Sequence, residues 1–315
     1  MINVVDKTIF IPHTTRICLS CTLFLLSINE LLNIIKNPAL KTCYVDDCNI
    51  CISGKNLISP QQHAQIILNQ VEEFSDDTVF RISLQKTYYM IFSRRHKNIE
   101  DIQLQMNGHK IEEKKQGKIL GVIMDYKLSW VPHIRMLKQQ CTKRLNIIKV
   151  LSSNSWGADF HIIKKTYEAI VRSKLDYASI FFDAASKSIK STLDPINNTG
   201  ARLICGAFRT SPAYSLLCEA GIPKLSERRR NLSINYVLKA ITNPNNPVKK
   251  LFQIAKESCQ ENITKGNYPN SLSYRVLFNL KNSKILFQNY LQMTLLLTLH
   301  GILRSRYKLI LLIQL

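Results

Sequence analysis

The stretch 42–52, which reads TCYVDDCNICI, constrains this chain most, because an adjacent carboxylate pair separates two short apolar runs. The β-capable residues on either side of Asp and Asn predict a hairpin with Asp46 and Asp47 at its tip. Two like charges beside an apolar core repel each other and lose hydration, so the arrangement is costly unless a cation lies between them. Mg²⁺ suits that position, since it prefers carboxylate oxygens and substrate phosphates. The alternative is ordinary turn chemistry on a solvated surface.

The net charge of the chain indicates which class of molecule it is expected to bind. The 315 residues include 43 Lys and Arg against 22 Asp and Glu, a formal net charge of +21. Such an excess favours a polyanionic partner, because each phosphate that is neutralised releases condensed counterions. The alternative is a basic protein that is merely soluble. The length allows a sizeable core and two domains.

Nine cysteines are scattered without a secretory pattern, which predicts an intracellular, reducing compartment. Cys18-x2-Cys21 and Cys48-x2-Cys51 have the spacing of a four-thiolate zinc site. We favour no zinc site, because both pairs lie in apolar runs without the Gly and Pro that shape a zinc knuckle.

Membrane insertion is not expected. A membrane-spanning helix needs about 18 uncharged apolar residues in a row, and no run reaches that length. The leucine-rich end, 291–315, comes closest, and His300, Arg304, Arg306 and Lys308 interrupt it.

The first part of the chain mixes strands and helices, which predicts an α+β domain. Residues 20–32 are expected to form a helix, and a second helix should begin at Ser59, capped by its own side chain and followed by Pro60. Its predicted buried face consists of Ala64, Ile67, Leu68, Val71 and Phe74. Strands are expected at 80–84, 88–92 and 118–125, with a turn at Asn107-Gly108.

From Ser129 onward the pattern predicts helices. The first should carry an apolar stripe over 134–151, with cations elsewhere on the same helix. These cations are Arg135, Lys138, Lys143, Arg144 and Lys149. A solvated basic face and a face that follows a phosphate backbone are both consistent with this pattern. Later helices are expected over 159–174, 188–205 and 227–241.

The segment Tyr44-Val45-Asp46-Asp47 resembles the Y/F-x-D-D box of reverse transcriptases, in particular those of non-LTR (LINE-type, jockey- or I-like) retrotransposons. The similarity continues in order from about Leu19 to Pro247. Further similar segments are the helix 20–32, Ser53 to Leu57, Gln85 to Ser93, the K-I-L-G-V-I-M-D run 118–125, Leu128 to Trp130, Trp156 to Asp159, Leu175 to Tyr177, Leu193 to Ile196 and Gly206 to Pro212.

The resemblance implies two-metal nucleotidyl transfer with Mg²⁺, in which a primer 3′ hydroxyl is joined to a dNTP on an RNA template. It places Asp46 and Asp47 as metal ligands and Lys86 near the leaving pyrophosphate. Tyr44 would lie beside the primer terminus. Gly121 would allow close backbone approach near the primer, or would simply form a hairpin bend. The implied partners are an RNA template and a DNA primer or duplex, with no membrane and no small molecule beyond dNTP.

The predicted architecture is α+β: a partial reverse-transcriptase palm, with an antiparallel sheet and packed helices, followed by an all-helical thumb. We expect the palm over 1–127, the thumb over 128–247 and a poorly matching, aberrant tail over 248–315. The fingers and the first catalytic strand are expected to be missing, and the family's G-x-P-Q-G-S segment is replaced at His13 to Cys18. The predicted function is therefore a truncated, inactive polymerase. The alternatives are a non-catalytic basic nucleic-acid-binding module and a product that does not fold stably.

Overall fold

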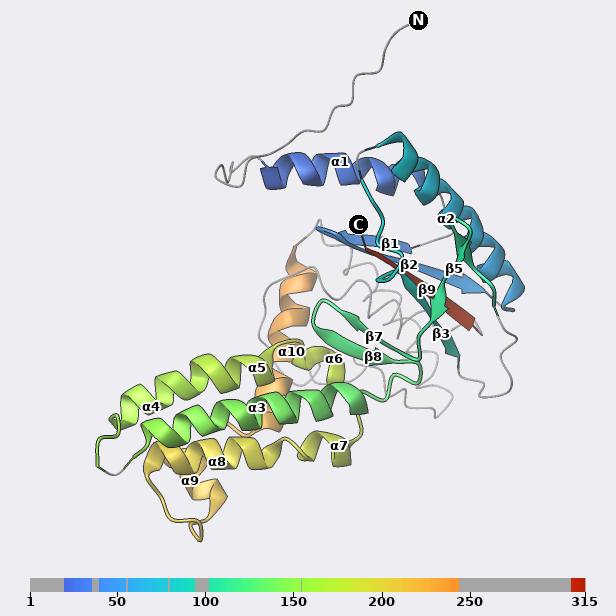
Figure 1. The fold of residues 1–315 in the computed structure, drawn as a ribbon. Helices are drawn as coiled ribbons and strands as arrows, with labels where there is room; N and C mark the ends of the chain where they lie inside the picture. The colour runs from blue at the N-terminus through green and yellow to red at the C-terminus, as the bar shows by residue number, and fades with distance from the viewer. Residues whose placement is uncertain are drawn as a thin grey trace, which may run out of the picture. The chain divides into compact units, whose positions relative to one another are not determined.

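The computed structural model describes residues 20–35, 40–54, 56–78, 80–93, 102–153, 155–243 and 307–314 (Figure 1). The predicted replacement at His13 to Cys18 lies outside these ranges. The chain divides into two compact units, which we call the sheet unit and the helical unit. The sheet unit comprises the described residues up to Tyr89, residues 102–113 and the strand near residue 310. The helical unit comprises residues 114–243 together with the short segment Met90 to Ser93.

The largest sheet among the described residues has five strands in the order β1-β2-β9-β3-β6, and four of them, all but β3, lie in the sheet unit. The five strands are β1 (Leu40–Tyr44), β2 (Asp47–Gly54), β9 (Tyr307–Gln314), β3 (Tyr88–Ser93) and β6 (Glu112–Glu113). β1 and β2 pair antiparallel, as expected, but β3 and β6 pair in parallel. The sheet is therefore mixed, and the expected antiparallel pairing is wrong at this edge.

Strand β9 comes from the leucine-rich end of the chain and lies between β2 and β3. Leu309 to Ile313 are all buried, and Leu309, Ile310 and Leu311 are 0% exposed. A continuous apolar run is typical of a strand covered on both faces, whereas an edge strand alternates. Part of the expected aberrant tail is thus a central strand, while residues 248–306 lie outside the described ranges.

Two helices accompany the sheet, α1 (Ser20–Ile34) and α2 (Ile58–Asp77). α2 packs against β2, and its predicted apolar face is buried. The predicted cap at Ser59 is wrong: the helix begins one residue earlier, and the Ser59 N–H donates to Asn56 Oδ1 at 3.4 Å. A short hairpin, formed by β4 (Gln105–Met106) and β5 (His109–Lys110), turns at Asn107-Gly108, as predicted.

The predicted strand over 80–84 does not form. Ser83 begins a turn instead, since its carbonyl accepts from the Lys86 and Thr87 N–H groups. Phe80 packs its ring against Phe74, 5.8 Å between centroids, so the apolar alternation reflects packing on α2 rather than a sheet. β3 then follows at the predicted position.

The helical unit starts with a hairpin of β7 (Gln116–Ile119) and β8 (Val122–Asp125). The residue pattern predicted one strand over 118–125, whereas the family resemblance allowed a hairpin bend at Gly121. The bend is observed, because Leu120 and Gly121 have φ of 46° and 84° and turn the chain between the two strands. Asp125 then starts the next helix, because its carboxylate accepts from the backbone N–H groups of Ser129 and Trp130 at 3.0 and 2.9 Å.

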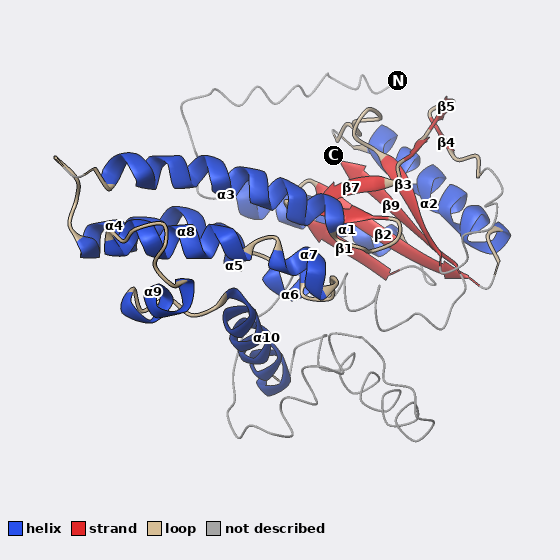
Figure 2. Ribbon diagram, turned by 90° about the horizontal axis from the view of Figure 1, so that it is seen from below, coloured by secondary structure: helices blue, strands red, loops and turns tan. Residues whose placement is uncertain are grey.

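Helices follow from α3 (Val131–Leu151) onward, and α3 packs against α4, α5 and α8 (Figures 1 and 2). The expected helix over 159–174 is one run with a π-helical turn in its middle, and the one over 188–205 is broken at Thr192-Leu193. The remaining elements are α4 (Phe160–Tyr167), η1 (π-helix, Glu168–Arg172), α5 (Ser173–Asp176), α6 (Ser179–Phe182), α7 (Lys187–Ser191), α8 (Asp194–Cys205), α9 (Ala213–Glu219) and α10 (Leu225–Thr242).

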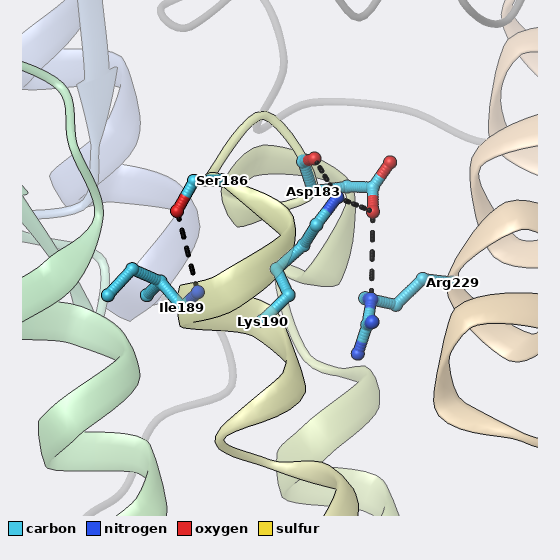
Figure 3. Close-up of polar contacts among 5 residues, drawn as sticks. All are labelled: Asp183, Ser186, Ile189, Lys190 and Arg229. Carbon is cyan, nitrogen blue, oxygen red and sulfur yellow. Dashed lines mark hydrogen bonds and ion pairs between the residues drawn. The ribbon is translucent and has the colours of Figure 1, made fainter.

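Polar contacts tie these short helices together. Asp183 accepts from Lys190 Nζ at 3.0 Å and lies 3.6 Å from Arg229 Nε, which joins the segment before α7 to α10 (Figure 3). Arg229 is 5% exposed, and burial lowers its pKa. Arg228 pairs with Asp176 at 2.8 Å. Two of the three guanidinium groups in the Arg228 to Arg230 run, those of Arg228 and Arg229, therefore lie in ion pairs within the helical unit.

Candidate functional site

The Asp46-Asp47 hairpin forms where the sequence predicts it. Tyr44 pairs with Asp47, so the turn consists of Val45 and Asp46, and Asp47 is already the first residue of β2. Val45 has φ of 55°, a left-handed conformation that is strained for a β-branched residue. Both carboxylates are half-buried, whereas the Tyr44 and Val45 side chains are 56% and 46% exposed. The pair thus lies at the tip of a hairpin, near its apolar neighbours but accessible.

A disulfide closes the base of this turn. Cys43 and Cys48 face each other across the strands, with Cα atoms 4.2 Å apart, and are joined through their sulfur atoms. This pairing was not predicted from the sequence. Cys48 is also removed as a thiolate ligand, so the alternative zinc site through Cys48 and Cys51 has no support.

Electrostatics at the tip follow from the crowding of charges. Burial, followed by the neighbouring Asp46 carboxylate, raises the pKa of Asp47, while the Lys86 ammonium lowers it. Lys86 is exposed in the turn that leads into β3. The structure therefore brings three predicted residues, Asp46, Asp47 and Lys86, into one electrostatic neighbourhood.

A fourth residue at the tip was not predicted. Gln314, the last residue of β9, donates its side-chain amide to Asp46 Oδ2 at 3.3 Å. The Gln314 carbonyl accepts from the Ser83 N–H at 2.9 Å, so its backbone is held as well. No local pattern marks this glutamine, because its importance depends on a strand pairing between segments more than 250 residues apart.

Gly121 belongs to the helical unit, where it occupies the β7–β8 turn. Tyr177 lies against this turn, donating its hydroxyl to the Leu120 carbonyl at 2.7 Å, and a Cβ added at Gly121 would lie 3.6 Å from the tyrosine ring. The residue therefore forms a hairpin bend, one of its two predicted uses.

The predicted basic residues of α3 fall into two groups. Arg135, Lys138, Lys143 and Lys149 are exposed. Arg144 is half-buried and donates to the Ile170 carbonyl, in the π-helical turn, at 2.6 Å. Nine residues at about 100° each place Arg144 roughly 180° from Arg135, so helical phase alone separates the two. Arg144 therefore packs the helical unit, and four cations form the exposed face of α3.

Sequence comparison finds relatives among RNA-directed DNA polymerases. The chain is 23% identical over 220 residues to the polymerase of mobile element jockey from Drosophila melanogaster, covering 69% of this chain and 23% of the relative. The Drosophila funebris jockey polymerase is 21% identical over 232 residues, covering 73% and 25%. A third is the probable RNA-directed DNA polymerase from transposon BS of D. melanogaster, 20% identical over 166 residues, covering 53% and 18%.

The chain is related to the reverse transcriptases of non-LTR retrotransposons. This confirms the resemblance inferred from the ordered boxes. No protein-family model matches, and no solved structure matches. The chain spans about a quarter of the length of the two jockey polymerases. Within the described ranges, none of the helices is both long and apolar enough to cross a membrane.

Whether the tip fits the divalent cation of a reverse transcriptase depends on its donors. Asp46 and Asp47 offer the oxygen ligands that Mg²⁺ prefers. Among the described residues, however, no third His, Cys, Asp or Glu completes a group around them. The side chain that does reach Asp46 is a neutral amide that presents a hydrogen to the carboxylate. This donor set does not fit a tightly held divalent cation.

Proposed function

We propose that this chain is a palm-and-thumb portion of a non-LTR retrotransposon RNA-directed DNA polymerase. The palm part would extend to about residue 127 and the thumb over 128–247. The observation that carries the proposal is similarity to two jockey polymerases over 69% and 73% of the chain. Because the chain spans about a quarter of those relatives, DNA synthesis by the whole polymerase is not ascribed to it alone.

The partner we propose is an RNA template paired with a DNA primer. The exposed face of α3, formed by Arg135, Lys138, Lys143 and Lys149, would follow the phosphate backbone. Such a face binds by charge, so it holds a duplex without reading its sequence. The formal charge of +21 supports this assignment.

Binding tests this proposal directly. The triple variant Lys138→Glu, Lys143→Glu and Lys149→Glu should bind an RNA–DNA duplex about a hundredfold more weakly at moderate salt, with a shallower salt dependence, because it removes three phosphate contacts. Fluorescence anisotropy over a salt series measures both effects. Arg144 is left intact, because its loss would disturb packing.

The matched control reverses three other exposed cations of the helical unit: Lys165, Lys187 and Arg230. Its total charge equals that of the α3 variant. If the two variants bind equally weakly, the net charge and not the face of α3 holds the duplex, and the α3 assignment is refuted.

We also propose that Asp46 and Asp47 descend from a nucleotidyl-transfer site and that this chain does not itself extend a primer. The support is the Gln314 amide, which donates to Asp46 Oδ2 and so presents a hydrogen, not a ligand oxygen, at that carboxylate. The places near the primer and pyrophosphate predicted for Tyr44, Gly121 and Lys86 belong to an active relative. Mg²⁺ likewise belongs there.

Primer extension on an RNA template with Mg²⁺ or Mn²⁺ checks this. The native chain and Asp46→Ala should both give no product. Extension by the native chain that disappears in Asp46→Ala would show a working enzyme and overturn the proposed inactivity.

A further inference from the structure

Strand β9 holds Gln314 at the hairpin tip by two independent contacts. Its five preceding residues, 309–313, are buried in the sheet, so the strand cannot shift without exposing them. The Gln314 carbonyl accepts from Ser83, and its side-chain amide donates to Asp46. Position 314 is therefore fixed, and whatever side chain stands there faces the Asp46 carboxylate.

The tip needs something to offset its two carboxylates. Asp46 and Asp47 are adjacent and both half-buried at the tip, so their like charges repel each other in the folded chain. Lys86 acts on Asp47, where it lowers the pKa. Asp46 has Gln314 as a hydrogen-bond partner. A hydrogen bond donated to a carboxylate stabilises its ionised form, as a bound cation would, without adding charge.

We propose that Gln314 takes the place of a divalent cation at the Asp46–Asp47 tip, so that this chain folds and keeps both carboxylates in position without metal. The proposal deepens the proposed function, since it rests on the carboxylate pair being a polymerase-derived site. It assigns position 314 as the residue that determines whether the tip requires a cation.

The consequence is a gain of metal dependence by a single change. In Gln314→Glu, a third carboxylate replaces the amide in the same fixed position. Three neighbouring negative charges repel one another strongly, and they also supply the oxygen ligands that Mg²⁺ and Mn²⁺ prefer. The variant should be unstable without metal and stabilised by it.

Hydrogen exchange of the full chain measures the local stability of β2, the strand that begins at Asp47. In EDTA, the amides of β2 should exchange at least tenfold faster in Gln314→Glu than in the native chain. Addition of 10 mM Mg²⁺ or 1 mM Mn²⁺ should restore protection to the variant, because a ligand that binds only the folded state stabilises it. Native protection should change less than twofold with either ion.

Two further variants complete the test. Asp46→Asn combined with Gln314→Glu should lose the metal response, since one ligand is gone. Gln62→Glu, an exposed charge change on α2 of the same unit, should show neither loss nor rescue. Native protection that rises with metal as much as that of Gln314→Glu, or a Gln314→Glu variant that metal does not rescue, would overturn the proposal.

The outcome is separable from that of the proposed function. Duplex binding by α3 and primer extension do not report on β2 exchange. A chain that binds no duplex can still show the metal switch at position 314, and a chain without the switch can still bind duplex.

Discussion

The two units reach an ordered core by opposite routes. In the helical unit, neighbours in space are mostly neighbours in sequence: α3 packs against α4, α5 and α8, all within about 60 residues of its end. In the sheet unit, the central strand β9 lies beside β2 although more than 250 residues separate them. The two units also differ in how their charged side chains are neutralised. The helical unit pairs Arg228 and the buried Arg229 with carboxylates, while the sheet unit places two carboxylates together and offsets them with an amide and a lysine.

This contrast shows which parts of the structure depend on residues that are close in sequence. A helical core can be assembled from periodic segments, so each substitution there acts on a nearby, readable contact. The sheet depends on one remote strand, so a change in β9 should disturb residues that are far away in sequence. The following predictions test that distinction, beginning with the largest effect.

Leu311→Asp should produce the largest difference in stability between the two units. Leu311 is 0% exposed in β9, and replacing it by a charge removes apolar burial and buries an unpaired carboxylate, a cost of about 5 kcal/mol or more. Hydrogen exchange should show β2 and β3 losing protection while α3 and α8 keep theirs.

The control is Ser53→Asp, at an exposed position of β2, which should leave exchange almost unchanged. Equal loss of protection in α3 and in β2 would mean that the two units unfold as one, and the comparison between them would fail.

In the helical unit, the buried His133 should make stability depend on pH. Its Nδ1 accepts from the Ile123 N–H at 3.3 Å, and its ring packs on Phe182. Burial, followed by the charge of Lys174, lowers its pKa to about 4 from the usual 6.5. The unfolded chain then takes up the proton first as pH falls, so stability present above pH 6.5 is lost progressively down to about pH 4, by about 3 kcal/mol.

Urea unfolding of the helical unit at pH 7.5, 6 and 5 measures this loss. His133→Asn keeps an acceptor for Ile123 but does not titrate, so its stability should change less over the same range. An unchanged pH dependence in His133→Asn would assign the effect to other groups.

Gly200→Ala tests close packing in the helical unit. A Cβ at this position of α8 would lie 2.2 Å from Tyr167 Cε2, and Tyr167 is held by its hydroxyl bond to Asn197 at 2.9 Å. Overpacking should cost about 2 kcal/mol despite the better helix propensity of alanine. Thermal or urea unfolding measures it.

Gly206→Ala is the matched control, because no atom lies within 4 Å of its added Cβ and only its positive φ of 60° is unfavourable. It should cost no more than about 1 kcal/mol. A Gly200→Ala variant as stable as the native chain would show that the Tyr167 ring can move aside.

The smallest expected effect is a gain. Val45→Gly should stabilise the sheet unit by about 1 kcal/mol, because glycine adopts the observed φ of 55° without strain. Exchange of the β1 and β2 amides should slow by several-fold. The control is Thr42→Gly, at an ordinary strand position, which should make the exchange of these amides faster. If Val45→Gly also made it faster, the turn would not keep the observed φ in solution.

Much of the structure could be predicted from local sequence. The hairpin, α1, the buried face of α2, β3 and α3 follow from short-range pattern, and the phase of Arg144 could have excluded it from the exposed face. The start of α2 at Ile58 and the strand predicted over 80–84 were wrong although both had a local pattern, and the role of 307–314 has no local signal at all. Pairing of β9 with β2 depends on the free energy of the whole sheet, so neither the strand nor Gln314 could be placed from sequence.

The position of β9 has a consequence for protein synthesis. While the ribosome is making the helical segments, β2 and β3 already exist but the strand that fills the space between them does not. Their backbone edges would stay available to other chains for the whole of that interval, which favours aggregation or capture by a chaperone. The helical unit can therefore fold during translation, whereas the sheet must wait for residues 307–314.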